Sequence, residues 1–422
     1  MSEWYTETLG QLADAAGGAI RTGPFGSQLH RHEYVHDGEV AVVMPRDMID
    51  GRIAVDSIAR IDRETANRLA EHLLQPSDIV LARRGDVGRA AWVDASDGAV
   101  LCGTGSMRIH LPGGKVMPRY LHYVLQAGDA VDWLQAQAVG ATMPNLNADI
   151  VRGLPVRYPD LPTQRSIVEI LDSADDLIES NWRRSTLLEK MAQTIYREWF
   201  VRLRYPGHER DKRIASSLGV VPDGWEIATF SELGDFMNGF AFKPAHWGDV
   251  GLPIVKIKEL KSGVSASTPR YNGTAVPLKY RVEDGDLLFS WSAHLDAYLW
   301  SGGSAWLNQH LFKVGPARGI AKSWLFLTIR EHIDEFRARS QGTTMKHIKR
   351  AALKEVVAAT PPPELMRAFA GVVDPILGHG IVLSRVRRSL AEIRDLLLPK
   401  LVSGALDVSQ LDLDALLQGS TV

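Results

Sequence analysis

The feature that most constrains this chain is a run of apolar residues, spaced alternately four and three positions apart, between Ile167 and Trp199. This spacing places one apolar stripe along a helix and leaves the charged residues on its other faces, as in helices that pair in coiled coils. At about 1.5 Å per residue, such a helix would be roughly 50 Å long. A helix of that length seldom packs within one globular domain, so the pattern predicts a spacer between two bodies rather than the buried helix of an ordinary domain. The stripe comprises Ile167, Leu171, Ala174, Ile178, Asn181, Ser185, Leu188, Ala192, Ile195 and Trp199.

The chain also repeats itself. Segments of its first half recur in the same order in its second half, and the second copy is slightly shorter, because the separation between matching residues decreases along the chain. Ordered matches of this kind indicate two copies of one structural unit. The matches pair residues 4–14 with 225–235, 22–23 with 238–239, 42–46 with 254–258, 78–81 with 286–289, and 140–143 with 342–345.

A second apolar stripe at helical spacing follows the second copy. It comprises Phe369, Val373, Ile376, Leu383, Val386, Leu390, Ile393, Leu397 and Leu401. Prolines precede both stripes, where they block earlier helix but permit a helix to start. We therefore expect the two helices to bury their stripes on each other, in antiparallel orientation because the chain returns through a whole second copy. The predicted coiled-coil seam is Ile167, Leu171, Ile178, Leu188 and Ile195 with Phe369, Val373, Ile376, Leu383, Leu390 and Leu397.

Within each copy, β-branched runs alternate with turns, which is typical of a curled, mostly antiparallel sheet. Strands are predicted at 40–44, 79–82, 90–93, 107–111, 253–257, 286–291 and 310–314, and shorter helices at 119–127 and 321–339. The fold class is therefore α+β, with two tandem globular domains that are each followed by a long helix. The predicted boundaries are 1–160 for the first globular domain, 161–203 for the first helix, 204–221 for a linker, 222–362 for the second globular domain, 363–404 for the second helix and 405–422 for a C-terminal tail.

Composition limits the class of protein. The chain has 422 residues, of which 45% are hydrophobic and 23% charged, as in soluble multidomain proteins. Its single cysteine, Cys102, excludes a disulfide framework and suits the reducing cytoplasm. The N-terminal residues have no signal-peptide pattern, and no apolar run approaches the length needed to cross a bilayer, so we expect a cytoplasmic protein with no membrane partner. The formal net charge of −2 gives no support to nucleic-acid binding, so any such site must come from local clusters.

No catalytic constellation stands out. Gly103-Thr-Gly105 lacks the third glycine of a dinucleotide loop, and the Asn/Asp-Pro-Pro-aromatic signature of amino-methyltransferases is missing. A nuclease site could be assembled from Asp249, Glu259 and Lys261, but carboxylates and a lysine at that spacing are common by chance. Histidines 30, 32 and 36 lack cysteine or carboxylate partners at metal-site spacing and are interpreted as solvated loop residues. We therefore expect no metal and no catalytic residue in this chain.

Basic clusters are more informative. Lysine and arginine on the loops of a rigid sheet can neutralise phosphates, and arginine can also reach base edges with two hydrogen bonds. A solvated charged face is the alternative for any single cluster, but recurrence in both copies favours DNA binding. The candidate DNA-binding residues are Arg46, Arg83, Arg84 and Arg89 in the first copy, and Lys256, Lys258, Lys261, Lys346, His347, Lys349 and Arg350 in the second, where Lys256 to Lys261 are expected along a strand edge.

Several motifs resemble one known family over nearly the whole chain. The strongest are Leu161-Pro-Thr-Gln164-Arg165 and Tyr196-Arg197-Glu198-Trp199-Phe200, followed by Pro222-Asp-Gly224-Trp225, Gly285-Asp286-Leu-Leu-Phe289, Asn308-Gln309-His310 and Gly342-Thr-Thr-Met345. Together they are similar to the DNA specificity subunit of type I restriction–modification systems. Pro363-Glu-Leu-Met366 departs from the family's usual Pro-x-x-Glu-Gln at the start of the second helix.

The resemblance implies two target-recognition domains, each of which reads one half of a bipartite, asymmetric site in double-stranded DNA. It implies that the paired helices set the separation of the two halves, and that two methyltransferase subunits and translocating restriction subunits bind this chain. S-adenosylmethionine, and ATP with Mg²⁺ for restriction, would then serve those partners, and this chain would be non-catalytic with no cofactor of its own. The alternatives are an enzyme with an unrecognised nuclease or methyltransferase site, and a scaffold that binds only proteins.

Overall fold

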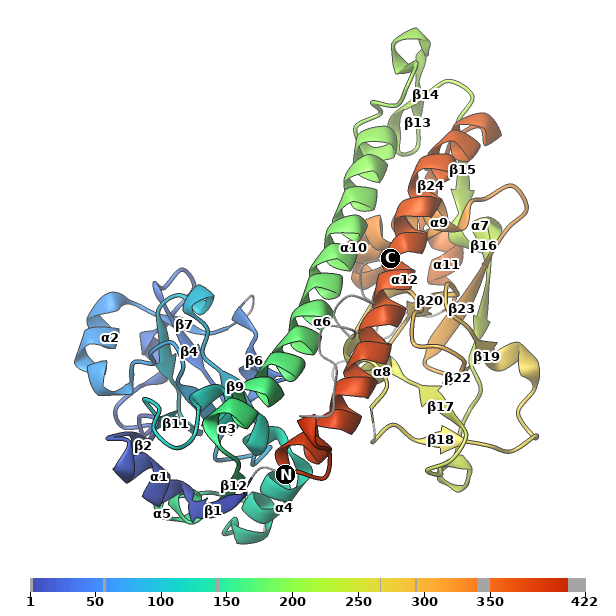
Figure 1. The fold of residues 1–422 in the computed structure, drawn as a ribbon. Helices are drawn as coiled ribbons and strands as arrows, with labels where there is room; N and C mark the ends of the chain where they lie inside the picture. The colour runs from blue at the N-terminus through green and yellow to red at the C-terminus, as the bar shows by residue number, and fades with distance from the viewer. Residues whose placement is uncertain are drawn as a thin grey trace. The chain divides into compact units, whose positions relative to one another are not determined.

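The computed structural model describes residues 3–55, 58–140, 144–265, 267–292, 294–339 and 350–408. The chain forms two compact units. Unit 1 contains Met1–Asp176 and Ala391–Val422, and unit 2 contains Leu177–Leu390. Two long helices, α6 (Leu161–Tyr196) and α12 (Pro363–Val402), are each divided between the units, with one segment in unit 1 and the other in unit 2 (Figure 1).

Unit 1 is built on two four-stranded sheets and a short outer ladder. In the first sheet every neighbouring pair is antiparallel, and in the second β10 runs parallel to β4. The first sheet has the order β2 (Ala19–Thr22), β11 (Ser106–His110), β8 (Ile79–Ala82), β9 (Ala90–Trp92). The second has the order β10 (Val100–Cys102), β4 (Val40–Val43), β7 (Arg60–Ile61), β3 (Tyr34–Val35), and the ladder pairs β1 (Tyr5–Thr8) with β12 (Pro155–Tyr158). Helices α1 (Leu9–Ala15), α3 (Pro118–Gln126), α4 (Gly128–Gln137) and α5 (Ala148–Arg152) pack against the first sheet and share one hydrophobic core with it.

Unit 2 repeats this plan, which confirms the internal duplication. Its antiparallel sheet has the order β16 (Gly234–Asn238), β23 (Leu311–Pro316), β20 (Leu287–Ser290), β21 (Asp296–Leu299). Its mixed sheet has the order β18 (Arg270–Tyr271), β17 (Leu252–Val255), β22 (Ala305–Leu307), β19 (Arg281–Val282), and its ladder pairs β15 (Glu226–Thr229) with β24 (Val357–Thr360). Among the described residues, each unit contains one parallel pair, β4·β10 or β17·β22, and its other strand pairs are antiparallel, in agreement with the predicted mostly antiparallel sheet.

Two expectations about unit 2 are wrong in detail. The strand predicted over residues 253–257 ends at Val255, and α8 (Ile257–Ser262) follows it, so Lys256 to Lys261 do not lie along a strand edge. The reason is the carboxylate of Glu259, which accepts the N–H of Lys256 at 3.0 Å and caps the helix. The helix predicted over residues 321–339 is two helices, α9 (Lys322–Glu331) and α10 (Ile333–Ala338).

Capping chemistry explains why the opening segments of both copies match. Thr8 and Gln11 form a capping box at the start of α1, in which the amide of Thr8 donates to Oε1 of Gln11 at 2.9 Å. Thr229 and Glu232 do the same at α7 (Phe230–Leu233), where the amide of Thr229 donates to Oε2 of Glu232 at 2.8 Å. The repeated Thr-x-x-Gln/Glu pattern therefore turns the chain from an outer strand into a helix at the same place in each unit.

A repeated ion pair links the two central strands of each antiparallel sheet. Asp78 accepts the amide N–H of the residue three positions earlier at 2.7 Å and lies 2.7 Å from Arg108 on β11. Asp286 makes the equivalent amide contact at 2.8 Å and lies 2.7 Å from Lys313 on β23. The matched aspartates thus fix the turn before β8 or β20 and hold it to the neighbouring strand.

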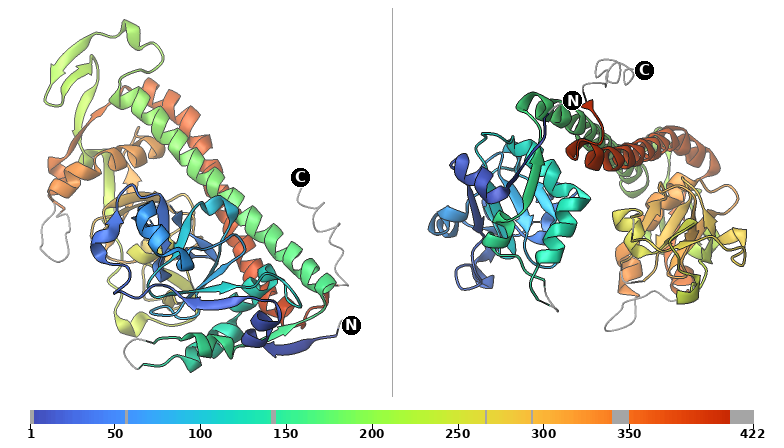
Figure 2. Two further views of the ribbon diagram at one scale, coloured as in Figure 1. Left: turned by 90° about the vertical axis from the view of Figure 1, so that its left-hand side faces the viewer. Right: turned by 60° about the horizontal axis from the view of Figure 1, so that its bottom comes forward.

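The long helices pair in antiparallel orientation, which confirms the predicted architecture (Figures 1 and 2). In unit 1 the start of α6 packs against the end of α12, through Ile167 and Leu171 with Leu401. In unit 2 the end of α6 packs against the start of α12, through Tyr196 with Phe369. Each residue of the predicted α6 stripe is buried or half-buried.

The stripe on α12 differs from the prediction. Val386 and Ile393 are exposed, whereas Leu377 and Leu398 are buried in the cores of unit 2 and unit 1, respectively. Apolar residues occur on several faces of this helix, so periodicity alone does not define its contact face. Of the predicted seam residues, Ile167, Leu171, Phe369, Val373 and Leu383 are buried, and Ile178, Leu188, Ile195, Ile376, Leu390 and Leu397 are half-buried.

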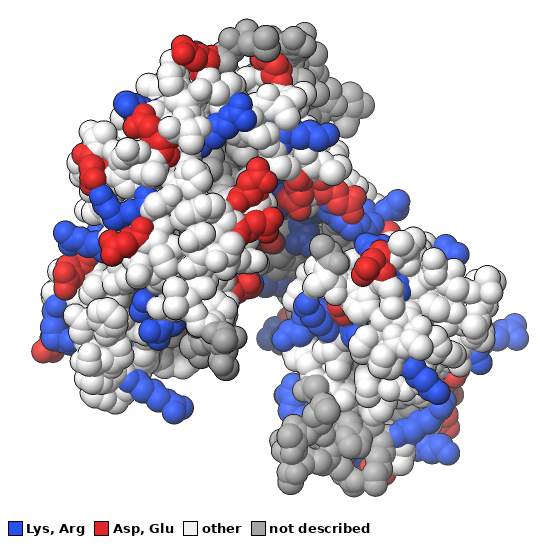
Figure 3. All heavy atoms as spheres, turned by 90° about the horizontal axis from the view of Figure 1, so that it is seen from below, with Lys and Arg blue, Asp and Glu red and all other residues white. Residues whose placement is uncertain are grey.

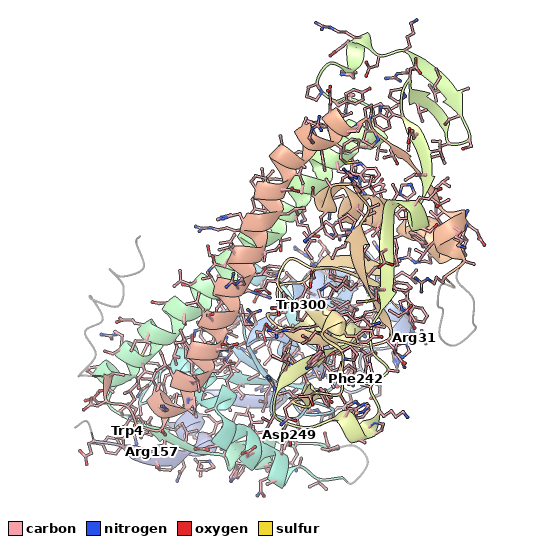
Figure 4. All side chains as sticks on the ribbon, turned by 90° about the vertical axis from the view of Figure 1, so that its right-hand side faces the viewer. Trp4, Arg31, Arg157, Phe242, Asp249 and Trp300 are labelled. Carbon is pink, nitrogen blue, oxygen red and sulfur yellow. The ribbon has the colours of Figure 1, made fainter. Side chains whose placement is uncertain are left out.

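The last turn of α12 and the residues after it complete the core of unit 1. Leu401 and Val408 are buried there, and the backbone carbonyl of Val402 accepts the hydroxyl of Tyr120 at 3.3 Å. The ring of Trp4 lies against Gly404, and the guanidinium of Arg157 lies 5.1 Å from the centre of that ring (Figure 4). The N-terminal strand and the last turns of α12 therefore belong to one packed unit.

Between the copies, the segment interpreted as a linker contains a β-hairpin of β13 (Arg213–Ser216) and β14 (Gly219–Pro222). The helix α12 is long and apolar enough, by length and composition, to cross a membrane. The expectation that no run approaches that length is therefore wrong for this helix. Part of its apolar character is accounted for by packing, because Met366, Phe369 and Val373 are core residues of unit 2.

Candidate nucleic-acid interface

In each unit, the loops that follow four strands meet at one end of the two sheets. In unit 1, β2 and β8 both run antiparallel to β11, so they end at the same edge of the first sheet. In the second sheet β10 runs parallel to β4, so these two strands also end at one edge. The loops are residues 23–28, 44–47, 83–88 and 103–105, and backbone hydrogen bonds join them, such as that from the amide of Arg83 to the carbonyl of Gly105 at 2.9 Å. We call these residues the first loop edge. The second loop edge of unit 2 consists of residues 239–247, 256–261, 291–292 and 308–310, which follow β16, β17, β20 and β22.

A glycine is required at the same point of both loop edges. A Cβ on Gly23 would lie 2.2 Å from the carbonyl oxygen of Gly103, and one on Gly239 would lie 2.3 Å from the carbonyl oxygen of Asn308. Any side chain at these positions would force two backbone segments apart. The glycine in the repeated 22–23 and 238–239 pair thus permits the loops to approach closely.

Arg83 and Arg84 differ sharply in their surroundings. Arg83 is only 4% exposed, and its Nη1 donates to Oδ1 of Asn145 at 3.3 Å. Its guanidinium lies 5.7 Å from the centre of the Phe25 ring, and burial, followed by the neighbouring charge of Arg84, lowers its pKa. Arg84 is exposed, and its Nε donates to the same Asn145 oxygen at 3.2 Å. Of this pair, only Arg84 is available to a ligand.

The other two candidates of unit 1 are exposed. Arg46 lies in the short helical turn η2 (Pro45–Asp47), with its Nε 3.7 Å from the carboxylate of Asp47. Burial raises the pKa of Asp47, and its Oδ2 accepts the amide of Met44 at 2.9 Å, so this acid holds the turn. Arg89 precedes β9, pairs with Asp86 and donates to a backbone carbonyl at 3.2 Å, so part of its hydrogen-bonding capacity is used within the protein.

The lysines of unit 2 lie on and before α8. Lys256 places its Nζ 4.3 Å from the centre of the exposed Trp247 ring, a cation–π arrangement. Lys258, the counterpart of Arg46 in the repeat, is exposed and donates to the hydroxyl of Ser267 at 3.2 Å. Lys261 is exposed at the last turn of α8. The second loop edge therefore presents lysine and tryptophan where the first presents arginine.

Of the third basic cluster, the structure describes only Arg350. Lys346, His347 and Lys349 lie outside the described residues, as do residues 141–143 and 342–345 of the repeated turn. Arg350 lines a hollow of about 430 Å³ together with Asp235 and Lys354. This hollow lies beside the first residues of β16, at the other end of that strand from Gly239.

Sequence reasoning missed three residues at the loop edges: Phe25 and Trp247, which belong to them, and Asn145, which is hydrogen-bonded to Arg84 of the first loop edge. Phe25 and Trp247 could have been found, because an aromatic residue among turn-forming residues is unusual unless it is used. Asn145 is 61 residues from Arg84 in the chain and no local pattern marks it. On the face drawn in Figure 3, Lys and Arg side chains are interspersed with Asp and Glu, in keeping with the net charge of −2.

The structure does not support the alternative nuclease site, because Glu259 is engaged within the protein. Glu259 is buried, and its two oxygens accept the amide of Lys256 at 3.0 Å and the hydroxyl of Thr268 at 3.2 Å. A carboxylate engaged in this way holds a helix rather than a metal. Asp249 lies in an exposed loop before β17 (Figure 4). Among the residues that the structure describes, no three His, Cys, Asp or Glu side chains form a metal-binding group.

Two tandem α+β units, each with a loop edge of cationic, amide and aromatic side chains and each joined to a long helix, define a duplicated recognition protein. Comparison with known families agrees with that class. The family model "Type I restriction modification DNA specificity domain" matches residues 1–190 and 222–365. The chain belongs to this family.

Similar proteins of comparable length share this assignment. The Type I restriction enzyme MjaIX specificity subunit of Methanocaldococcus jannaschii is 22% identical over 97% of this chain and 95% of its own length. The HindI specificity subunit of Haemophilus influenzae is 22% identical over 79% of this chain and 88% of its own. The crystal structure of a type I restriction-modification S subunit from M. genitalium shares the fold, with a TM-score of 0.54 and 14% identity over 95% of this chain and 96% of that one.

Proposed function

We propose that this chain is the DNA-recognition subunit of a type I restriction–modification complex and that each unit reads one half of a bipartite, asymmetric site. The observation that carries this proposal is the pair of loop edges, which occupy the same place in two copies of one fold but carry different side chains. A shared scaffold with different loop residues is what two unlike half-sites require, because base contacts give specificity and the scaffold gives position.

Backbone contacts are assigned to the exposed cations. Arg46 in the turn η2 and its counterpart Lys258 in α8 each follow a matched strand, β4 or β17, and there a charged side chain can neutralise a phosphate without reading a base. Lys256, Lys261 and Arg89 extend these surfaces, and Lys346, His347, Lys349 and Arg350 remain candidates for the same role. The interspersed charge of the chain suits a subunit that shares its phosphate contacts with partner proteins.

Two methyltransferase subunits are proposed to dock on the long helices, with restriction subunits joining for cleavage. This proposal is supported by apolar side chains that stay exposed on both helices, since exposed apolar patches commonly mark protein interfaces. They are Leu161, Leu177, Trp182, Leu187 and Met191 on α6, and Val372, Val382, Val386, Ile393 and Leu396 on α12. S-adenosylmethionine, ATP and Mg²⁺ would then be used by the partner subunits in the cytoplasm, and the purified chain alone should turn over none of them.

A helix-length experiment tests the proposal. One heptad is inserted into α6 after Asp176 and one into α12 after Leu390, where the two units meet in the chain. Seven residues lengthen a helix by about 10 Å, or about three base pairs of DNA. Methylome sequencing should then show the same two half-sites separated by a longer unread spacer. An unchanged spacer with altered half-sites would contradict the proposed mechanism.

A further inference from the structure

We propose that Arg84 is the residue with which unit 1 reads a guanine, and that Asn145 is the positioning residue that aims it. This inference rests on the proposed function and assigns one base of one half-site. It concerns the guanidinium of Arg84, whose Nε is hydrogen-bonded to the protein and whose Nη1 and Nη2 have no hydrogen-bond partner among the described residues.

The backbone at Arg84 is paired with the segment that contains Asn145. Arg84 and Asn145 form an isolated antiparallel bridge, and the amide of Leu146 donates to the carbonyl of Arg83 at 2.9 Å. Asn145 is held in turn by Val139, with amide-to-carbonyl hydrogen bonds of 3.1 and 3.0 Å in the two directions. Arg84 thus lies on a three-stranded backbone arrangement, although it is in a loop. A side chain on such a base loses little freedom when it binds a ligand.

The side chain of Asn145 then sets the orientation of the guanidinium. Its Oδ1 accepts Nε of Arg84 at 3.2 Å and Nη1 of the buried Arg83 at 3.3 Å. Among the residues that the structure describes, Nη1 and Nη2 of Arg84 have no hydrogen-bond partner. These two atoms form the end of the guanidinium that can donate two parallel hydrogen bonds. Guanine presents the matching pair of acceptors, O6 and N7, in the major groove of DNA.

The other arginines of unit 1 do not have this arrangement. Arg83 is buried, with Phe25 beside it, and its hydrogen bond to Oδ1 of Asn145 helps to hold that side chain in place. Arg89 is paired with Asp86. Arg46 is exposed on a turn and lies beside the adjacent Asp47, so its charge is available but no hydrogen bond from a neighbouring loop residue of the described structure fixes its direction. Arg84 alone among the four combines exposure, a fixed Nε and a free donor edge within the described residues.

The test uses the complete complex with its methyltransferase subunits and a panel of duplexes in which each base pair of the recognised site is replaced in turn. Arg84→Lys keeps the charge but removes the forked donors. It should lower discrimination at one G·C pair in one half-site by about 10- to 100-fold, and leave the other half-site and the salt dependence as they are. Arg46→Ala is the matched control for charge. It should slow methylation of all duplexes alike and reduce the salt slope by about one.

Asn145 is tested by its own pair of variants. Asn145→Asp retains an oxygen that can accept Nε of Arg84 and should keep the guanine preference, whereas Asn145→Ala should lose it. Discrimination in the other half-site reports whether the complex is still assembled and folded. Retention of the preference in Asn145→Ala would overturn the positioning role.

Two outcomes separate this inference from the proposed function. If the wild-type complex discriminates base pairs in both half-sites and Arg84→Lys changes none of them, or changes a pair other than G·C, the assignment of Arg84 is wrong and the function stands. If the wild-type complex discriminates no base pair at all, the proposed function itself fails.

Discussion

Arg394 of α12 donates from Nη1 to Oδ1 of Asp175 of α6 at 2.9 Å, and the two side chains are only 11% and 9% exposed. The second oxygen of Asp175 accepts the hydroxyl of Tyr123 on α3 at 2.9 Å. Asp175 lies off the apolar stripe of α6, yet it joins three helices of unit 1. A charged contact at this depth restricts how these helices meet, because separating the pair would leave a buried charge without its partner.

Removal of one partner of this buried pair is expected to be costly. Arg394→Ala leaves Asp175 buried without its strongest cation and should lower the free energy of unfolding by about 3 kcal/mol. The matched control is Asp176→Ala, because Asp176 is 79% exposed and lies 3.5 Å from Arg52, and its loss should cost no more than about 0.5 kcal/mol. Urea unfolding followed by circular dichroism measures both, and equal effects would show that the buried pair is not important for unit 1.

The contact face of α12 gives a second prediction. Leu401 is fully buried in the core of unit 1, whereas Leu396 is 66% exposed on the same helix. Leu401→Ala should lower the free energy of unfolding by about 2–5 kcal/mol through lost contacts and the cavity left behind, and Leu396→Ala should change it by less than about 0.5 kcal/mol. Thermal unfolding distinguishes them. A larger effect at Leu396 would mean that the other face of α12 is the packed one.

The stripe of α6 could be predicted from the sequence because charged residues define its outer faces clearly. On α12 the apolar residues Val382, Val386, Ile393 and Leu396 occupy the exposed side, so the same reasoning chose a face that is partly wrong. Nothing in the local pattern marks Arg394 as buried. Its partner is far away in the chain, and only the folded structure brings the two together.

The loop edges show the same limit. The repeat predicted that Arg46 and Lys258 would be equivalent, and both lie just after matched strands, Arg46 in the turn η2 and Lys258 in α8. The repeat did not show that a helix starts after Lys256. Glu259 caps that helix, but in the sequence it cannot be distinguished from the other charged residues of the segment. The repeat also did not show that Arg83 is buried while Arg84 is exposed. That difference comes from Asn145 and Phe25, which are distant in the sequence.

A backbone difference between the copies gives a third prediction. Ser77 has a φ of +76°, and the residue at the same place in unit 2 is Gly285, with a φ of +88°. A residue with a Cβ is strained in this region, whereas glycine is not. Ser77→Gly should therefore raise the free energy of unfolding by about 0.5–1 kcal/mol, and Gly285→Ser should lower it by about 1 kcal/mol. Changes of the same sign in both variants, measured by urea unfolding, would contradict the matched geometry of the two turns.

His122 gives a prediction about pH. It is fully buried on α3 between the rings of Trp92 and Tyr123, whose centres lie 5.9 and 5.6 Å away. Burial, and then the positive charges of Arg119, Arg52 and Arg394, hold its pKa well below the ordinary value of 6.5. The unfolded chain binds a proton below pH 6.5 that the folded protein does not bind. The contribution of neutral His122 to the free energy of unfolding is therefore fully present above pH 6.5. It is lost as the pH falls from 6.5 towards the folded pKa, by up to about 1.4 kcal/mol per pH unit.

Phe326 occupies the same place on α9, so His122→Phe is a substitution that the fold already accommodates in its other unit. This variant should show a smaller loss of stability between pH 6.5 and pH 5 than the wild-type chain. The residual slope would include His72, whose pKa is also lowered by burial. His36→Phe is the control, because His36 is exposed and its replacement should leave the slope as it is. Urea unfolding at a series of pH values measures each slope, and parallel slopes for His122→Phe and the wild-type chain would mean that His122 is protonated inside the folded protein.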